Sequence, residues 1–194
     1  MTTLRVQRRN METKAKKLRR EGYVTGNLFG KEIEGSIPLQ IDKQEAERIK
    51  RECMKGSQLY LELEGKTYDV LVKELDYRAM DHQILEMDFQ ALVKGEKVHS
   101  VAEVILLNKE KVTEGVLEQL LEEIPYKATP ENLVEKVEID CSTLRLGDTL
   151  RVGDLDMAKS GKVDLHVELD APIVSILASH NEEPADEEEA SAEE

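Results

Sequence analysis

Apolar and polar side chains alternate over short stretches along most of this 194-residue chain, and such alternation predicts half-buried β-strands. Glycine and acidic residues separate the stretches and predict tight turns, as at Glu64-Gly65, which joins two strands into a hairpin. In the first half the strands are expected at residues 2–6, 24–29, 36–41, 58–62, 67–75 and 84–92.

Two helices are expected between these strands. The clearer one covers residues 43–55, with Asp42 as N-cap, Glu45 placed as in a capping box, and an apolar face formed by Ala46, Ile49 and Cys53. A shorter helix at residues 14–21 has Ala15 and Leu18 on one side.

The second half also reads as short strands between Gly and Asp turns, which is typical of an antiparallel sandwich or a barrel-like domain. A short helical turn is expected at residues 141–144. Residues 116–123 are ambiguous, because Leu117, Leu120 and Leu121 have helical spacing while the flanking Gly115 and Ile124-Pro125 fit a strand and a loop. The remaining strands are expected at residues 98–107, 133–140, 148–152, 163–167 and 172–177.

Charge divides the chain unevenly. The formal net charge is −14, but residues 1–20 carry +7, residues 1–94 carry +2, and residues 95–194 carry −16. Length and this asymmetry favour two domains, at 1–94 and 95–180, joined at Lys94-Gly95-Glu96-Lys97. The last stretch, 181–194, has eight acidic residues and no basic ones, so we expect a disordered acidic tail.

Several function classes are disfavoured by composition. The sequence has no apolar run long enough to span a bilayer and no N-terminal signal core, so we expect a cytoplasmic protein with no membrane partner. Cys53 and Cys141 form no CxxC pair, which argues against a disulfide framework or a zinc site. The glycines at 22, 26 and 30 are spaced as turn glycines rather than as a phosphate loop, which argues against a nucleotide-dependent enzyme.

One acidic cluster is a candidate acid/base or metal site: Asp76, Asp81, Glu86 and Asp88, with His82 among them. Such clusters arise readily in a chain with 35% charged residues. The remaining histidines are expected to be isolated surface residues without metal-ligand spacing: His99, His166 and His180. We therefore expect no catalytic residue, no metal and no cofactor.

The segment from residue 14 to 30 combines a cationic helix, a glycine stop at Gly22 and a strand that ends in an aromatic residue. Its cations point away from the packed side of the helix and are expected to contact RNA phosphate: Lys16, Lys17, Arg19 and Arg20. The competing interpretation is a solvated face whose charges only complement the helix dipole. Phe29 could stack on a base or belong to the core, and Tyr68 is expected in the core.

Three segments together resemble one known family: residues 14–30, Val72 to Asp76 followed by Met87-Asp88-Phe89, and Val137 to Leu155. It is the bacterial large-subunit ribosomal protein that binds 5S rRNA, in its long two-domain form, also called the general stress protein Ctc. The resemblance implies a small N-terminal β-barrel that binds 5S rRNA by its minor-groove side, and a C-terminal β-rich domain.

The same resemblance implies that the partners are 5S rRNA, the large ribosomal subunit and neighbouring ribosomal proteins, and that the protein is monomeric off the ribosome. The RNA-binding set then becomes Lys16, Lys17, Arg19, Arg20, Phe29 and Asp88. Asp88 is expected to accept a hydrogen bond from an exocyclic amino group or a 2′-hydroxyl of RNA, or else to pair with a nearby cation.

This chain departs from the family pattern at four places. It has residues 7–13 where members carry an Arg and a Gly-Lys-Gly-like stretch, Thr25-Gly26 in place of Pro-Ala, Phe29 in place of Tyr, and Glu86 in place of a His. The last change places a carboxylate where phosphate would be repelled. An alternative function is therefore a divergent, stress-associated module that binds proteins and has weakened RNA binding.

Overall fold

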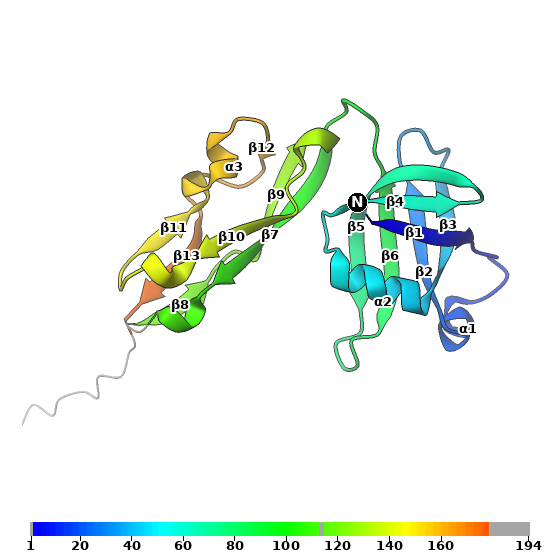
Figure 1. The fold of residues 1–194 in the computed structure, drawn as a ribbon, viewed down its shortest axis with the longest axis horizontal. Helices are drawn as coiled ribbons and strands as arrows, with labels where there is room; N and C mark the ends of the chain where they lie inside the picture. Colours follow the sequence, from blue (N-terminus) through cyan, green and yellow to red (C-terminus); the bar gives the residue numbers. More distant parts are fainter. Residues whose placement is uncertain (1, 113–114, 179–194) are drawn as a thin grey trace, which may run out of the picture.

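A computed structural model describes residues 2–112 and 115–178 of the chain. The protein is mainly β with a few short helices, as the alternation predicted (Figure 1). No helix in this described part has the length and apolar character needed to cross a membrane. The expected acidic tail, residues 181–194, lies outside the described residues.

Six strands of the first half close into a barrel in the order β1-β3-β2-β6-β5-β4 (Figure 1), which confirms the barrel that the family resemblance implied. Two neighbouring pairs are parallel, β1 with β4 and β2 with β6, and the other pairs are antiparallel. The strands are β1 (Thr3–Arg8), β2 (Tyr23–Phe29), β3 (Ser36–Asp42), β4 (Gln58–Leu63), β5 (Lys66–Tyr77) and β6 (Ile84–Ala91).

Alternate residues of these strands fill the barrel, and many of them are fully buried, among them Leu28, Met87 and Phe89. Tyr68 is half-buried and packs against this core, as expected. Helix α2 (Lys43–Glu52) packs on β1, β2 and β3 through Ala46 and Ile49. The barrel thus has one continuous core beneath its outer surface.

Two details of α2 differ from the prediction. The helix ends three residues earlier, because Cys53 is already extended (φ −129°, ψ 148°) and serves as the C-cap. Asp42 does cap the N-terminus, but its carboxylate accepts from the N–H of Gln44 at 2.8 Å, and Glu45 instead binds Arg48 at 2.7 Å. The predicted capping box is therefore wrong, because a cationic side chain one turn later takes the Glu45 carboxylate.

The second half forms two further sheets, a four-stranded one in the order β10-β7-β9-β12 and a three-stranded one in the order β11-β13-β8. Their shared core includes Ala102, Ile124, Tyr126, Ile139 and Ile173. The strands are β7 (Val98–Leu107), β8 (Val116–Gln119), β9 (Glu123–Ala128), β10 (Lys136–Asp140), β11 (Thr149–Arg151), β12 (Asp164–Leu165) and β13 (Pro172–Leu177). Short helical elements connect them: η1 (Lys109–Lys111), η2 (Pro130–Asn132), η3 (Cys141–Thr143), η4 (Val152–Asp154) and α3 (Asp156–Lys159).

The β-rich character of this half was predicted, but three features were not. Residues 116–119 are a strand paired with β13, which resolves the ambiguity there. Residues 123–128, where Ile124-Pro125 suggested a loop, form strand β9 beside β7. Strand β10 runs parallel to β7, so the four-stranded sheet is not wholly antiparallel.

Candidate nucleic-acid interface

The cationic helix is α1 (Ala15–Arg20), and the predicted order of helix, glycine stop and strand is confirmed. Leu18 is 5% exposed and anchors the helix beside β2. Gly22 follows with φ +91°, a left-handed conformation that glycine adopts without steric cost, and the chain then enters β2. Anchoring through Leu18 leaves the other faces of this short helix to its charged side chains.

The four predicted cations of α1 differ in their surroundings. Lys16 and Arg20 are exposed, and within the described residues neither forms an ion pair. Lys17 lies 3.7 Å from the Glu21 carboxylate in an exposed pair one helical turn apart. Arg19 is half-buried, and its Nη1 donates a hydrogen bond of 3.2 Å to the carbonyl oxygen of Leu85 at the start of β6. Arg19 therefore ties α1 to the barrel, while the other three face solvent.

A second arginine, Arg9, lies in the loop between β1 and α1. Its Nη2 donates to the carbonyl oxygen of Thr13 at 3.1 Å. Its Nε is buried and has no hydrogen-bond partner among the described residues. Such a donor is costly in a folded protein unless another molecule satisfies it.

Strands β2 and β6 form a polar strip on the outside of the barrel, next to α1. The two strands are parallel and Asn27 lies opposite Asp88. The outward-facing side chains of β2 therefore lie directly beside those of β6. Both the backbone N–H and the Nδ2 of Asn27 donate to Oδ1 of Asp88, at 2.9 and 3.0 Å, and Nδ2 also donates to Glu86 at 3.2 Å. Phe29 is half-buried at the far end of the same strip, opposite Gln90. The structure thus brings Phe29 and Asp88 onto one face.

One interpretation of the sequence was that Asp88 pairs with a nearby arginine or lysine. Among the described residues Asp88 forms no such ion pair. Its Oδ1 is held by Asn27, and within the described part of the chain its Oδ2 accepts no hydrogen bond. This oxygen is the acceptor that the strip offers to a donor from outside.

Carboxylates accumulate beside this strip. In the register of β5 and β6, Glu74 lies opposite Asp88 and Asp76 lies opposite Glu86. Burial raises the pKa of the Glu86 carboxyl, the neighbouring carboxylates of Asp88 and Asp76 raise it further, and Arg19 and Arg9 act in the opposite direction. The barrel face is therefore acidic along β5 and β6 and cationic at α1.

The rest of the acidic cluster does not join this group. Asp81 forms an ion pair with Arg78 at 3.2 Å in the turn between β5 and β6, where His82 adopts φ +52°. No group of three or more potential metal ligands is found among residues 2–112 and 115–178.

Two predicted isolated histidines are neighbours. The rings of His99 and His166 are 4.9 Å apart in an edge-to-face arrangement, so they are exposed, as predicted, but not isolated. His180 lies outside the described residues. His99 lies in β7 and His166 directly follows β12, so they are 67 positions apart in sequence. They lie close together because β7 and β12 are the two neighbours of the same strand, β9.

Sequence reasoning did not single out Asn27 or Arg9. The only local signal for Asn27 was its place between Thr25 and Phe29 on one side of a predicted strand. Its partners Glu86 and Asp88 are 59 and 61 residues away, and the parallel pairing that joins them has no local signature.

Comparison with known proteins places this arrangement, a barrel that bears a cationic helix and is followed by a β-rich part, in a class of bacterial ribosomal proteins. Residues 4–89 match the model of the Ribosomal L25p family, and residues 97–180 match the C-terminal domain of ribosomal protein TL5. The chain belongs to the Ribosomal L25p family, in its long form.

The relatives match this chain over most of their own length. The chain is 32% identical to the large ribosomal subunit protein bL25 of Carboxydothermus hydrogenoformans, over 89% of this chain and 86% of that protein. It is 30% identical to bL25 of Listeria monocytogenes serotype 4b, over 94% and 88%, and 31% identical to that of Geobacillus kaustophilus, over 88% and 80%. The protein is accordingly a structural, non-enzymatic component of the large ribosomal subunit, cytoplasmic and ribosome-associated.

Proposed function

We propose that the protein binds 5S rRNA within the large subunit through α1 and the adjoining strip of β2 and β6. The observation that carries the proposal is the set of solvent-facing cations on a helix that is fixed to the barrel by Leu18 and Arg19. Because the backbone of such a helix is already ordered, phosphate binding by its cations requires no large further loss of backbone entropy.

The six proposed contacts have different tasks. Lys16, Lys17 and Arg20 neutralise phosphates, and Arg19 does so only with the part of its guanidinium that Leu85 leaves free. Phe29 offers a partly exposed ring on which an unstacked base can lie, and Asp88 offers Oδ2 to a 2′-hydroxyl or an exocyclic amino group.

The direct test is a titration of 5S rRNA with the full chain at two salt concentrations, with a structured RNA of equal length as control. Binding through three or four phosphates should weaken by about tenfold or more when salt rises from 0.05 to 0.2 M. Equal affinity for the control RNA, or an affinity that does not change with salt, would reject the proposal.

Glu86 is expected to limit this affinity. Replacing Glu86 by Gln removes a carboxylate beside the RNA strip but keeps an acceptor for Asn27, so 5S rRNA should bind several times more tightly. Because the pKa of Glu86 is raised, the native protein should also gain affinity as pH falls toward that pKa, and the variant should lose this part of the pH dependence. Glu62→Gln, in a strand away from the strip, is the control in the same titrations.

The acidic face along β5 and β6 favours a second candidate. In this second function, the chain is a stress-associated module that retains the fold, binds RNA weakly and binds basic proteins through its acidic second half. The two candidates differ in the titration above, since only the first requires tight and specific 5S rRNA binding.

We also infer that the chain folds as two domains, at 1–94 and 95–180, with 181–194 as a separate tail. The barrel strands end at Ala91 and the next strand begins at Val98, and the two family models leave residues 90–96 between them. The junction carries contacts of its own: Lys55 pairs with Glu123 at 2.9 Å, and Nζ of Lys73 donates to the carbonyl oxygen of His99 at 2.8 Å.

A further inference from the structure

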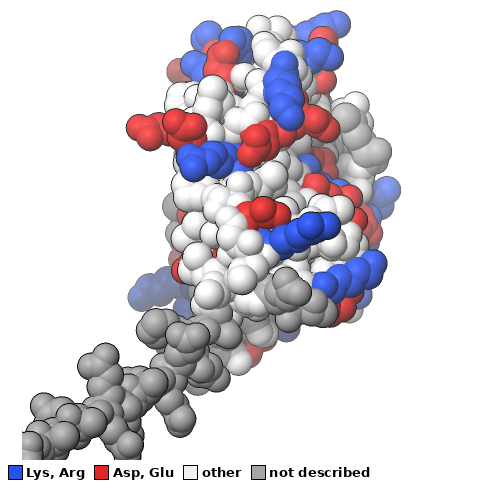
Figure 2. All heavy atoms as spheres, turned by 90° about the vertical axis from the view of Figure 1, so that its left-hand side faces the viewer, with Lys and Arg blue, Asp and Glu red and all other residues white. Residues whose placement is uncertain are grey.

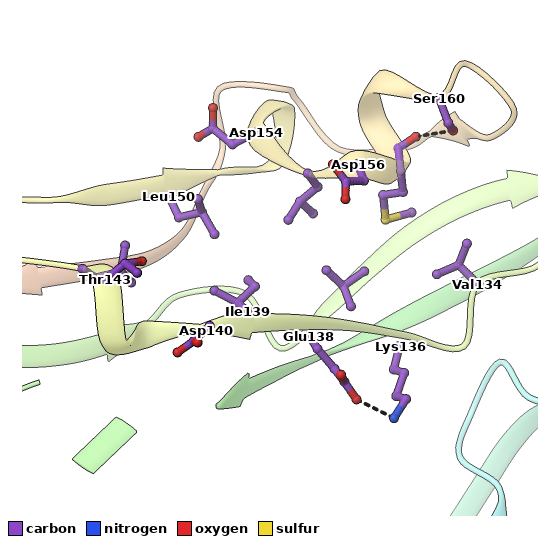
Figure 3. Close-up of a pocket in the computed structure, with 14 residues that line it drawn as sticks. Val134, Lys136, Glu138, Ile139, Asp140, Thr143, Leu150, Asp154, Asp156 and Ser160 are labelled. Atoms are coloured by element: carbon purple, nitrogen blue, oxygen red, sulfur yellow. Dashed lines mark hydrogen bonds and ion pairs between the residues drawn. The ribbon is translucent and has the colours of Figure 1, made fainter. Parts of the chain in front are cut away.

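A groove with an apolar interior runs along the outer edge of β10. On one side it is bounded by β10 and on the other by β11, η4 and α3 (Figure 3). Its volume is about 640 Å³. The apolar lining comes from both walls: Val137, Ile139, Leu150, Leu155 and Met157.

The wall formed by β10 is a free strand edge. Strand β10 stands at the end of its sheet, with β7 as its only strand neighbour in the described residues. The carbonyl oxygen of Glu135 accepts from the N–H of Glu103, so the backbone groups of residues 135, 137 and 139 face β7. The backbone groups of Lys136, Glu138 and Asp140 then face the groove side, and an unpaired edge of this kind can accept an added strand.

Carboxylates surround the groove. Asp140, Asp154 and Asp156 form no ion pair within the described part of the chain, whereas Glu138 pairs with Lys136. Hydrogen bonds from Asn108 and from the N–H of Ser142 lower the pKa of Asp140 to about 2, so it stays charged.

The other carboxylates are arranged similarly. Asp154 is fixed by the N–H of Arg151 at 3.0 Å, a bond that orients the carboxylate without cancelling its charge. Lys136 on β10 pairs with Glu138, and Lys159 on α3 donates to the carbonyl oxygen of Asp154, so neither lysine forms an ion pair with Asp140, Asp154 or Asp156 among the described residues. Local charge therefore favours a cationic occupant.

We propose that this groove binds an extended segment of a basic protein, in which apolar residues alternate with Lys or Arg, as an added strand on β10. A strand placed about 4.8 Å from β10 would direct alternate side chains into the apolar groove. The intervening side chains would lie beside Glu138 and Asp140, which project from the opposite face of β10 (Figure 3). The proposal concerns the second half of the chain and does not depend on 5S rRNA binding.

Charge separates this occupant from the alternatives. RNA is disfavoured because its phosphates would face three carboxylates without cationic partners. The chain's own residues 181–194 are disfavoured because they hold eight acidic residues and no basic ones. The face seen in Figure 2 carries charges of both signs with uncharged surface between them. The charge of this face as a whole therefore does not select a basic partner, and selectivity must come from the groove itself.

The experiment titrates the full chain with a fluorescein-labelled peptide in which Lys alternates with Val and Ile over seven residues. A peptide with Glu in place of every Lys is the control. We expect saturable binding of the basic peptide alone. On binding, the amide hydrogens of Lys136, Glu138 and Asp140 should gain protection from exchange, while those of Val137 and Ile139, which already face β7, should change little.

Matched variants identify the groove. The double change Glu138→Lys with Asp156→Lys should weaken binding by about tenfold or more, since two attractions become repulsions. Glu118→Lys with Glu168→Lys, an equal charge change at exposed sites outside the groove lining, should have little effect.

Glu138→Pro tests the strand edge separately from charge. It removes the N–H that faces the groove but none that faces β7, and Glu138→Thr makes the same charge change with the N–H retained. Glu138→Pro should weaken binding of the basic peptide much more than Glu138→Thr does.

Several results would overturn the proposal. They are equal binding of the acidic peptide, no binding of the basic one, equal losses in both charge-reversal pairs, protection of the amides of Lys136, Glu138 and Asp140 by 5S rRNA in the absence of peptide, or a dimer of the native chain that Glu138→Pro dissociates. The last two would assign the edge to RNA or to a second copy of this chain.

Discussion

Replacing Lys16, Lys17 and Arg20 together by Glu should weaken 5S rRNA binding by about a thousandfold at 0.1 M salt. Each phosphate contact contributes about tenfold at this salt concentration through the release of counterions, and three contacts are lost. The slope of log K against log salt should also fall in magnitude by about 3. Filter binding or fluorescence anisotropy over a salt series measures both quantities.

Arg19 is left unchanged in this variant for a structural reason. Its Nη1 donates to the carbonyl oxygen of Leu85, so an Arg19 substitution would loosen the attachment of α1 to the barrel as well as removing a charge. Among the residues that the structure describes, the other three side chains make no such hydrogen bond to the barrel. Loss of binding in the triple variant can then be attributed to charge.

A second triple variant controls for overall charge. Lys31, Lys43 and Lys66 are exposed and lie outside α1, and their replacement by Glu changes the net charge by the same amount. Because Glu in the last turn of α1 is unfavourable to the helix dipole, circular dichroism and the thermal midpoint of each variant must be compared with the native chain. Equal losses of affinity in both triples would mean that α1 is not the contact site.

Much of the fold could be predicted because strand alternation directly records which face of a strand is buried. Strand β7 shows this: every second residue is buried, the residues between them are partly or fully exposed, and both ends of the strand coincide with the prediction. The glycine stop was equally informative at Gly22, which follows α1 and has φ of +91°.

Strand β9 was missed because Pro125 suggested a loop. Proline is tolerated here because the carbonyl oxygen of Pro125 accepts from the N–H of His166, which places its backbone on the side away from β7. On that side β12 pairs only with Tyr126 and Lys127, so no ladder donor is required at Pro125. A local sequence signal cannot show which neighbour a strand edge will have.

The candidate site was partly predictable for the same reason. The cations of α1 are contiguous in sequence, so their clustering is visible without the fold. The coupling of Asn27 to Asp88 depends on parallel pairing between β2 and β6, and the groove depends on the place of β10 at the end of its sheet in the described structure. Both are consequences of sheet order, which alternation does not encode.

Phe89→Ala should destabilise the barrel by ~3–5 kcal/mol, the largest effect on folding that we predict. Phe89 is fully buried in β6, opposite Leu28 of β2 and Val72 of β5, so the truncated side chain leaves a cavity where three strands meet. For a unit of this size the thermal midpoint should fall by about 12 °C or more. Thermal or urea unfolding followed by circular dichroism measures the change.

Tyr60→Ala is the matched control, because this aromatic side chain points outward from β4 and is 37% exposed. Truncation of Tyr60 should lower the free energy of unfolding far less than truncation of Phe89. Hydrogen exchange then tests the proposed division of the chain. In Phe89→Ala the amides of the barrel core, such as Leu28 and Val72, should exchange faster, while those of Val104 and Ile139 keep their native protection.

Faster exchange at all four amides, with a single unfolding transition, would mean that the contacts of Lys55 and Lys73 across the junction join both halves into one cooperative unit. The boundary at residues 94 and 95 would then separate two sheet systems but not two domains. Retained protection in the second half would instead show that the β10 groove can keep its shape when the RNA-binding barrel is weakened.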